Sequence, residues 1–106
     1  TIVEGANGPI TPAADGILED MGVVVIPDIL ANAGGVVTSY FEWIQGKSGY
    51  YWDKQQVYNR LDDVMATAFD RVSEISTERN TTMRKAALLF GIGKVAKAAE
   101  LRGIRP

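Results

Sequence analysis

The sequence has 106 residues, of which 46% are hydrophobic and 23% are charged. This length allows at most one compact domain, and the composition is typical of a folded protein rather than a disordered or fibrous one. The formal net charge of −2 is too small for the usual basic nucleic-acid-binding surface, so we expect no nucleic-acid partner.

The sequence contains neither cysteine nor histidine. Within these residues this excludes disulfides, thiolate or imidazole metal ligands, a cysteine nucleophile and a histidine general base. We therefore predict no metal site and no catalytic residue in this segment. No apolar run approaches the ~20 residues of a membrane span, and the first residues do not resemble a signal peptide, so we expect a cytoplasmic protein without a membrane partner.

The first part of the chain predicts a strand, a helix and a second strand. Residues 1–4 favour a strand, and the glycine-rich segment 5–9 favours a turn. Thr11 can cap a short helix that Gly22 ends. Residues 23–26 form a β-branched run typical of a strand that is buried on both faces of a parallel sheet. Together they predict a βαβ unit and therefore the α/β fold class.

Helical periodicity dominates the remaining residues. We predict helices from Asn32 to about Gln45, from the capping pair Asp53 and Gln56 to about Arg79 with Asn80 as a C-cap, and from Thr81 or Thr82 to just before Gly103. Segment 46–49 is expected to be a turn. Tyr40, Phe41 and Trp43 are expected to be packing residues, because aromatic side chains dominate protein cores. Two strands do not make a stable sheet alone, so we expect a piece of a larger α/β domain or an oligomer.

Two glycine-containing segments resemble nucleotide-binding motifs only in their letters. Residues 91–96 match a dinucleotide fingerprint, but too few residues follow for the second strand and the ribose-binding acid. We predict a closely packed helix there. Residues 46–48 resemble the end of a P-loop, but Phe41 occupies the position of its first glycine and no strand precedes it. Neither segment is expected to bind phosphate.

The candidate site lies instead in two loops at the carboxyl ends of the predicted strands. Open α/β sheets bind ligands at that edge, and each loop carries one asparagine beside glycines, Asn7 and Asn32. An asparagine amide offers a donor and an acceptor, which suits a ribose or a carboxamide. The alternatives are a turn residue for Asn7 and a helix N-cap for Asn32. If the helix begins at Asn32, then Val36 and Ser39 share its face near the positive helix end.

Several blocks of these residues closely resemble the C-terminal part of glutamate dehydrogenases. The blocks are Glu4–Pro9, Thr11–Asp15, Pro27–Val36 and Ser39–Trp43, and the likeness continues through Tyr51–Trp52 and Met83–Ala87 to Gly103. Related leucine, valine and phenylalanine dehydrogenases share Asn-Ala-Gly-Gly but not the Ser-Tyr-Phe-Glu-Trp block. The resemblance therefore favours glutamate as the substrate, with another amino-acid dehydrogenase of this family as an alternative.

The resemblance implies oxidative deamination of glutamate to 2-oxoglutarate and ammonia, with hydride transfer to NAD or NADP in a homohexamer. It implies that residues 1–46 end a Rossmann-like cofactor domain and that residues 47–106 form a helical segment packed on it. By the same resemblance, Asn7 and Asn32 lie by the nicotinamide and its ribose, whereas Val36 and Ser39 contact the glutamate side chain, and Ser39 hydrogen-bonds its γ-carboxylate.

The residues that the family uses for catalysis have no counterpart in this sequence. The catalytic lysine and aspartate and the glycine-rich pyrophosphate loop of the family lie upstream of the matching region. We therefore expect the isolated 106-residue chain to be inactive and to need the rest of the dehydrogenase chain as its partner. A non-catalytic helical assembly module remains the alternative from another functional class.

Overall fold

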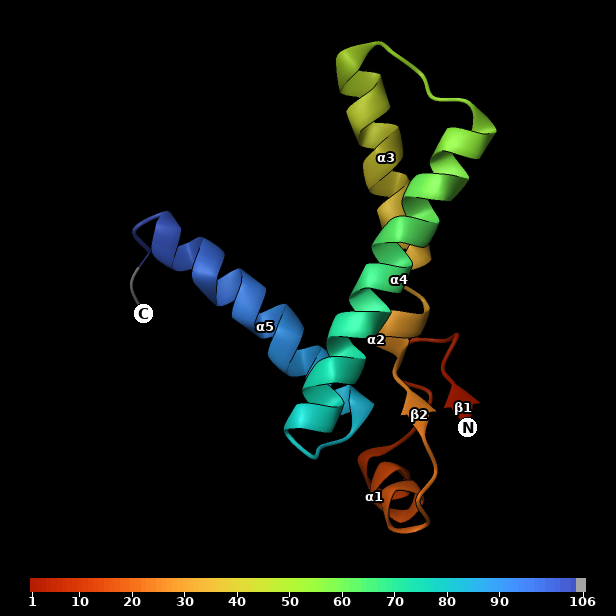
Figure 1. The fold of residues 1–106 in the computed structure, drawn as a ribbon, viewed down its shortest axis with the longest axis vertical. Coiled ribbons are helices and arrows are strands. Elements are labelled where there is room, and N and C mark those ends of the chain that lie inside the picture. The colour runs from red at the N-terminus through yellow and green to blue at the C-terminus, as the bar shows by residue number, and fades with distance from the viewer. Residues whose placement is uncertain (105–106) are drawn as a thin grey trace.

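The computed structural model describes residues 1–104, which form five helices and two short strands (Figure 1). In chain order these are β1 (Ile2–Val3), α1 (Pro12–Asp20), β2 (Val25–Ile26), α2 (Asp28–Ala31), α3 (Gly34–Ser48), α4 (Lys54–Glu78) and α5 (Met83–Leu101). Helices α3 and α4 form a long hairpin above the strands, and α5 projects from the base of that hairpin. The described chain is therefore mostly helical.

The two strands pair in parallel, as predicted. Ile2 pairs with Val25 and Val3 with Ile26. The second strand is shorter than predicted, because the backbone N–H of Val23 bonds back to α1 at Leu18 rather than to a neighbouring strand. The prediction that residues 23–26 are buried on both faces is also wrong for the described chain. Val24 is 52% exposed, since this sheet has two strands and little surface to cover them.

The termini of α1 follow their sequence signals. The Thr11 hydroxyl accepts the Ala14 backbone N–H, and Pro12 occupies the first turn, where its missing N–H costs no hydrogen bond. Gly22 adopts a φ of +67° just after the helix, a conformation that glycine adopts without steric cost. The chain then turns directly into the approach to β2.

The region after β2 differs from the prediction of one helix from Asn32 to Gln45. Asp28–Ala31 form the short helix α2, which the sequence pattern did not predict, and Asn32 is its C-cap. Helix α3 begins two residues later, at Gly34, and continues through the predicted turn to Ser48. It ends at Gly49, which has a φ of +67°. The helix therefore ends three residues later than the predicted Gln45.

Helices α4 and α5 begin and end close to where the sequence predicted. Asp53 and Gln56 form the predicted capping box. Asn80 has a φ of +46°, and the N–H of Thr81 donates to Ser76, which is the hydrogen bond of a Schellman ending. The Thr82 hydroxyl then caps α5 by accepting the N–H of Lys85.

The two glycine-containing segments that resemble nucleotide-binding motifs are helical and do not form phosphate-binding loops. Residues 91–96 lie within α5, as predicted, but an added Cβ at Gly91 or Gly93 would meet open space, so the expected close packing is absent from the described chain. Residues 46–48 form the last turn of α3.

The three aromatic residues of α3 divide into one packed and two exposed side chains. Phe41 is buried and meets Trp52 edge-on at 5.5 Å. Tyr40 and Trp43 are 56% and 58% exposed and stack on each other at 5.9 Å, so the expectation that they pack in a core is wrong for the described chain. Neither shares the face of α3 that carries Phe41 toward Trp52, because successive helix residues point in different directions.

A small core lies where α2, α4, α5 and β2 meet. It contains Leu30, Val72, Ala86 and Ala87, with partly buried neighbours that include Ile26 and Phe90. The radius of gyration is 16.3 Å, larger than the roughly 13 Å of a compact 100-residue domain. The α3–α4 hairpin and α5 account for this open shape, because both extend away from the core (Figure 1).

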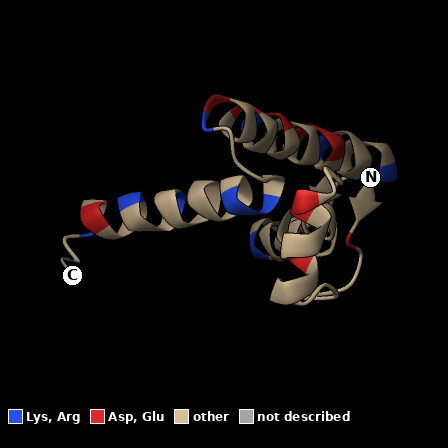
Figure 2. Ribbon diagram, turned by 90° about the horizontal axis from the view of Figure 1, so that it is seen from below, with Lys and Arg blue, Asp and Glu red and all other residues tan. Residues whose placement is uncertain are grey.

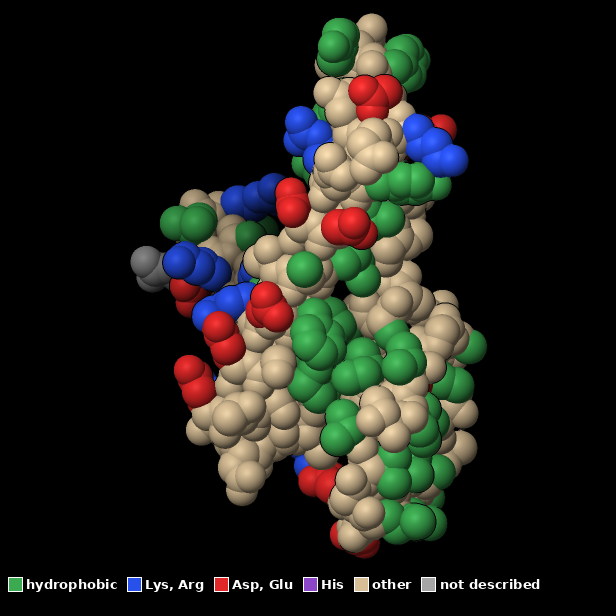
Figure 3. All heavy atoms as spheres, turned by 45° about the vertical axis from the view of Figure 1, so that its right-hand side comes forward, with side chains coloured by type: hydrophobic (Ala, Val, Ile, Leu, Met, Phe, Trp, Pro, Cys, Tyr) green, Lys and Arg blue, Asp and Glu red, His purple; other side chains and the backbone are tan. Residues whose placement is uncertain are grey.

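Hydrophobic side chains gather on the surface around the strands and the lower part of α4 (Figure 3). An apolar groove of about 350 Å³ lies there, lined by residues of β1, β2, α2 and α4 that include Val3, Leu30 and Phe69. Acidic side chains outnumber basic ones on α4, whereas the charged side chains of α5 are mainly Lys and Arg (Figure 2). Among residues 1–104, no helix combines the length and hydropathy needed to span a membrane.

Candidate functional site

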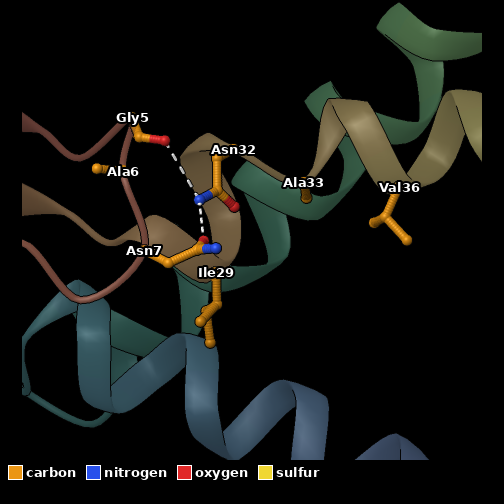
Figure 4. Close-up of a pocket in the computed structure, with 7 residues that line it drawn as sticks. All are labelled: Gly5, Ala6, Asn7, Ile29, Asn32, Ala33 and Val36. Atoms are coloured by element: carbon orange, nitrogen blue, oxygen red, sulfur yellow. Dashed lines mark hydrogen bonds between the residues drawn. The ribbon is translucent and has the colours of Figure 1, made fainter.

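The carboxyl ends of β1 and β2 open into one pocket, as expected for the edge of a parallel sheet. Loop 5–9 follows β1, and α2 follows β2. The pocket has a volume of about 470 Å³, within the roughly 300–1,000 Å³ of small-molecule sites. Its lining residues are Gly5, Ala6, Asn7, Ile29, Asn32, Ala33 and Val36 (Figure 4).

The two predicted asparagines meet directly in this pocket. The Asn32 side-chain amide donates to the Asn7 Oδ1 at 2.6 Å and to the Gly5 carbonyl at 3.3 Å. These bonds join residues that are far apart in the sequence, so neither asparagine is only a local turn or cap residue. The interpretation of Asn32 as an N-cap of the following helix is wrong, because Asn32 ends α2.

The asparagine pair leaves polar groups available to a ligand. Among the hydrogen bonds of residues 1–104, the Asn7 amide nitrogen and the Asn32 Oδ1 have no protein partner. Figure 4 shows the Asn32 oxygen directed away from loop 5–9. The pocket thus presents one donor group and one acceptor beside the apolar side chains of Ile29, Ala33 and Val36.

The other two predicted residues lie on α3 and differ in their placement. Val36 lines the pocket and is 70% exposed. Ser39 lies one turn farther along α3, outside the lining residues, and its hydroxyl donates to the Gly35 carbonyl at 3.1 Å. The predicted single helix face does not exist, because Asn32 lies outside α3. The structure brings Asn7, Asn32 and Val36 together in the pocket lining, whereas Ser39 lies outside that lining, one turn after Val36 on α3.

A partly buried cluster of charged side chains adjoins the two site loops. We call Glu4, Asp15, Asp28 and Arg84 the polar hub. Arg84, in the first turn of α5, makes two hydrogen bonds to the Glu4 carboxylate, at 2.7 and 2.9 Å, and two to Asp15, at 2.9 and 3.2 Å. Glu4 is only 2% exposed. The paired geometry matches the planar fork of a guanidinium, which lysine cannot reproduce.

The polar hub also holds the backbone of both site loops. Glu4 accepts the N–H of Asp28 at 2.8 Å. The Asp28 carboxylate in turn accepts the N–H of Gly8 at 2.7 Å and that of Ile29 at 2.8 Å. Loop 5–9 and α2 are therefore attached to each other by side-chain to backbone bonds as well as by the asparagine pair.

These bonds favour the charged forms of the hub. The hydrogen bonds from Arg84 hold the pKa of Glu4 below its ordinary value of 4.5, although burial opposes this shift. The backbone N–H groups of Gly8 and Ile29 lower the pKa of Asp28 from 3.8. The bonds to Glu4 and Asp15 raise the pKa of Arg84. Glu4, Asp28 and Arg84 are therefore ionised near neutral pH.

No local sequence pattern predicts the polar hub. Arg84 lies 80 residues from Glu4 in the sequence, and a single arginine at a helix start has no distinctive pattern. The one available signal was Glu4 itself, an acidic residue immediately after a strand and before the candidate loop.

Among residues 1–104, no cluster of acidic side chains is arranged to hold a metal ion.

Comparison with known proteins identifies the family. The family model for glutamate/leucine/phenylalanine/valine dehydrogenases matches residues 1–103. The chain belongs to this family. The match confirms the resemblance to the C-terminal portion of glutamate dehydrogenases that the residue blocks predicted.

Relatives in the family cover almost all of the chain. The glutamate dehydrogenase of Thermotoga maritima is 51% identical over 105 residues, which are 99% of this chain and 25% of that protein. The NAD-specific glutamate dehydrogenase of Clostridioides difficile is 49% identical over 102 residues, or 96% of this chain and 24% of that protein.

Solved structures of the family share the fold. The glutamate dehydrogenase of Peptoniphilus asaccharolyticus matches with a TM-score of 0.90 and 40% identity over 97% of this chain and 26% of that one. The hetero-hexameric enzyme of Thermus thermophilus, in a Leu-bound form, matches with a TM-score of 0.88 and 31% identity, covering 95% and 24%. The chain spans about a quarter of the length of these relatives.

Proposed function

We propose that the chain is the C-terminal portion of an NAD(P)-dependent glutamate dehydrogenase. The whole enzyme would convert L-glutamate to 2-oxoglutarate and ammonia while a hydride passes to the cofactor. The similarity to proteins named glutamate dehydrogenase at 51% and 49% identity supports the substrate. The NAD-specific relative supports an NAD-type cofactor.

The joined asparagines carry the proposal. Within it, Asn7 and Asn32 bind the nicotinamide half of the cofactor, through the Asn7 amide nitrogen and the Asn32 Oδ1. Both groups are available in the pocket, and Ile29 and Val36 provide an apolar border for a flat ring. The bond between the two amides orients them before a ligand arrives, which reduces the entropy cost of binding.

Val36 and Ser39 are proposed to bind the glutamate side chain. Val36 supplies an apolar contact, and the Ser39 hydroxyl donates to the γ-carboxylate in place of its present bond to Gly35. Their position on α3, next to the asparagines, supports a substrate that lies beside the nicotinamide. No residue of this segment is assigned to proton transfer, so the isolated chain is proposed to be inactive.

We further propose that residues 1–46 end a Rossmann-like cofactor domain and that residues 47–106 pack on it. The parallel strand pair and the bond from Arg84 to Glu4 support this division. The whole protein is proposed to be a cytoplasmic homohexamer. The hetero-hexameric relative from Thermus thermophilus supports the six-subunit assembly.

A crossed kinetic experiment on the full-length protein that carries this segment tests the assignment. Ser39→Ala is expected to raise KM for glutamate about tenfold or more, because a charge-assisted hydrogen bond is worth roughly 1.5–3 kcal/mol. Asn7→Ala is expected to raise KM for the cofactor instead. Ser48→Ala, at the other end of α3, and Asn59→Ala, on the exposed surface of α4, serve as matched controls and should change neither constant.

Two results would contradict the proposal. An unchanged glutamate KM in Ser39→Ala would remove Ser39 from the substrate site, and an unchanged cofactor KM in Asn7→Ala would remove Asn7 from the cofactor site. A substrate panel on the wild-type protein should show glutamate preferred over leucine, valine and phenylalanine. The pure 106-residue chain should form no NAD(P)H above the blank rate.

A further inference from the structure

The first turn of α5 is connected to the asparagine pair by a continuous set of hydrogen bonds. Arg84 bonds to Glu4, Glu4 accepts the N–H of Asp28, and Asp28 accepts the N–H of Gly8. Gly8 directly follows Asn7, whose Oδ1 accepts a hydrogen bond from the Asn32 side-chain amide. Each connection is 3.0 Å or shorter, and each joins elements that are distant in the sequence.

Apart from these bonds and the bond from the Asn32 amide to the Gly5 carbonyl, little else fixes the conformation of loop 5–9. Its residues are exposed, and Gly8 has a φ of +57° and no atom near the position that a Cβ would take. Burial therefore does not hold the Asn7 backbone in position. The carboxylate of Asp28 holds it by accepting the Gly8 N–H, and the position of Asp28 depends on Glu4.

Arg84 is the cation that allows Glu4 to occupy this position. Glu4 is 2% exposed, and among residues 1–104 Arg84 is the basic residue that hydrogen-bonds it. Removal of the guanidinium would leave a buried carboxylate unpaired, a costly state that is relieved by protonation or by movement toward water. Either response weakens the bond from Asp28 to Glu4 and releases loop 5–9 from α2.

We propose that Arg84 is a positioning residue for the Asn7–Asn32 pair, through which the start of α5 sets the geometry of the cofactor pocket. This inference rests on the proposed function, since the pocket's ligand is the cofactor named there. Arg84 does not line the pocket, so its effect on binding passes through Glu4 and Asp28.

A double-mutant cycle on the full-length protein tests this inference by direct binding. The dissociation constants of NADH and NADPH are measured from nucleotide fluorescence for wild type, Arg84→Met, Asn7→Ala and the double variant. Each single change is expected to weaken binding of the preferred cofactor about tenfold. The double variant should also be weakened about tenfold rather than a hundredfold, because a released loop has already lost the contribution of Asn7.

Lys85→Met is the matched control. Lys85 adjoins Arg84 and also reaches α1, through an exposed pair with Glu19 at 3.2 Å, but it has no bond to Glu4 or Asp28. It should leave cofactor binding unchanged. Arg84→Lys is the second variant if Arg84→Met does not fold. It keeps the charge without the fork, and it should weaken binding by about threefold.

The outcomes separate the inference from the proposed function. If Asn7→Ala weakens binding but both Arg84 variants bind like wild type, or if the two changes multiply to a hundredfold, the positioning role is wrong and the cofactor site stands. If Asn7→Ala itself binds like wild type, the cofactor assignment fails and the inference fails with it. A lower thermal midpoint with unchanged binding would show that Arg84 acts only in stability.

Discussion

The two halves of α5 differ in which kind of side chain is covered by the rest of the chain. Its first turns carry Arg84, whose charged side chain is 23% exposed, and Ala86, which is fully buried. Its second half carries Val95 and Leu101, which are 70% and 81% exposed. The same helix thus partly buries a charged side chain at one end and exposes apolar side chains at the other.

This contrast shows which part of the chain finds its contacts within these residues and which part does not. The polar hub satisfies its charges with hydrogen bonds from the chain's own backbone and side chains, so the pocket above it is formed within these residues. The distal half of α5 and the groove beside β1 present apolar surface that a folded protein usually covers. This difference supports the proposal that the chain is one portion of a larger dehydrogenase.

The largest effect on stability is expected at the hub. In the full-length protein, Glu4→Ala should lower the free energy of unfolding by about 3 kcal/mol, because it leaves Arg84 and the Asp28 N–H without their buried partner. The control Glu19→Ala removes only the exposed pair with Lys85 and should cost at most about 1 kcal/mol. Chemical denaturation measures both, and equal losses would show that the hub is no more important than a surface pair.

The hub should also make stability depend on pH. The folded pKa values of Glu4 and Asp28 are lowered from 4.5 and 3.8, so their contribution is complete above those unfolded values and is lost as pH falls through the folded ones. The free energy of unfolding should therefore fall as the pH decreases below about 5. Glu4→Gln should give a smaller slope in this range, and an unchanged slope would contradict the assignment.

A smaller effect is expected at the start of α4, far from the site. Asp53→Ala removes the capping box and should cost about 1 kcal/mol of stability, as N-cap replacements usually do. Asp62→Ala changes an exposed residue in the middle of the same helix and should change the free energy of unfolding by less than about 0.5 kcal/mol. Cofactor affinity should be unaffected in both variants. A loss of affinity would mean that α4 contributes to the pocket.

Local signals in the sequence predicted the starts of α1, α4 and α5 well, but not the bounds of α2 and α3. Thr11, Asp53 and Thr82 cap the helices that they were expected to cap, because a capping side chain and its backbone partners lie within a few residues of each other. The closeness of Asn7 and Asn32, though not the hydrogen bond between them, followed from the general geometry of parallel sheets. The roles assigned to these residues came from the family resemblance and stay predictions.

Non-local contacts caused the failures. Asn32 is the C-cap of α2 rather than the start of α3, and its side chain bonds to loop 5–9; no pattern around Asn32 reveals these contacts. The hub requires Arg84 to meet Glu4 across 80 residues, which only tertiary packing decides. The exposure of Val24 and Trp43 likewise depends on which surfaces lie nearby, and not on hydropathy alone.

The most direct test of the central claim is a structure of the full-length protein with NADH or NADPH bound. The account predicts that the nicotinamide half of the cofactor lies in the pocket between loop 5–9 and α2, with a hydrogen bond of about 3 Å to the Asn7 or Asn32 side chain. A bound cofactor whose nicotinamide half touches neither asparagine would contradict it.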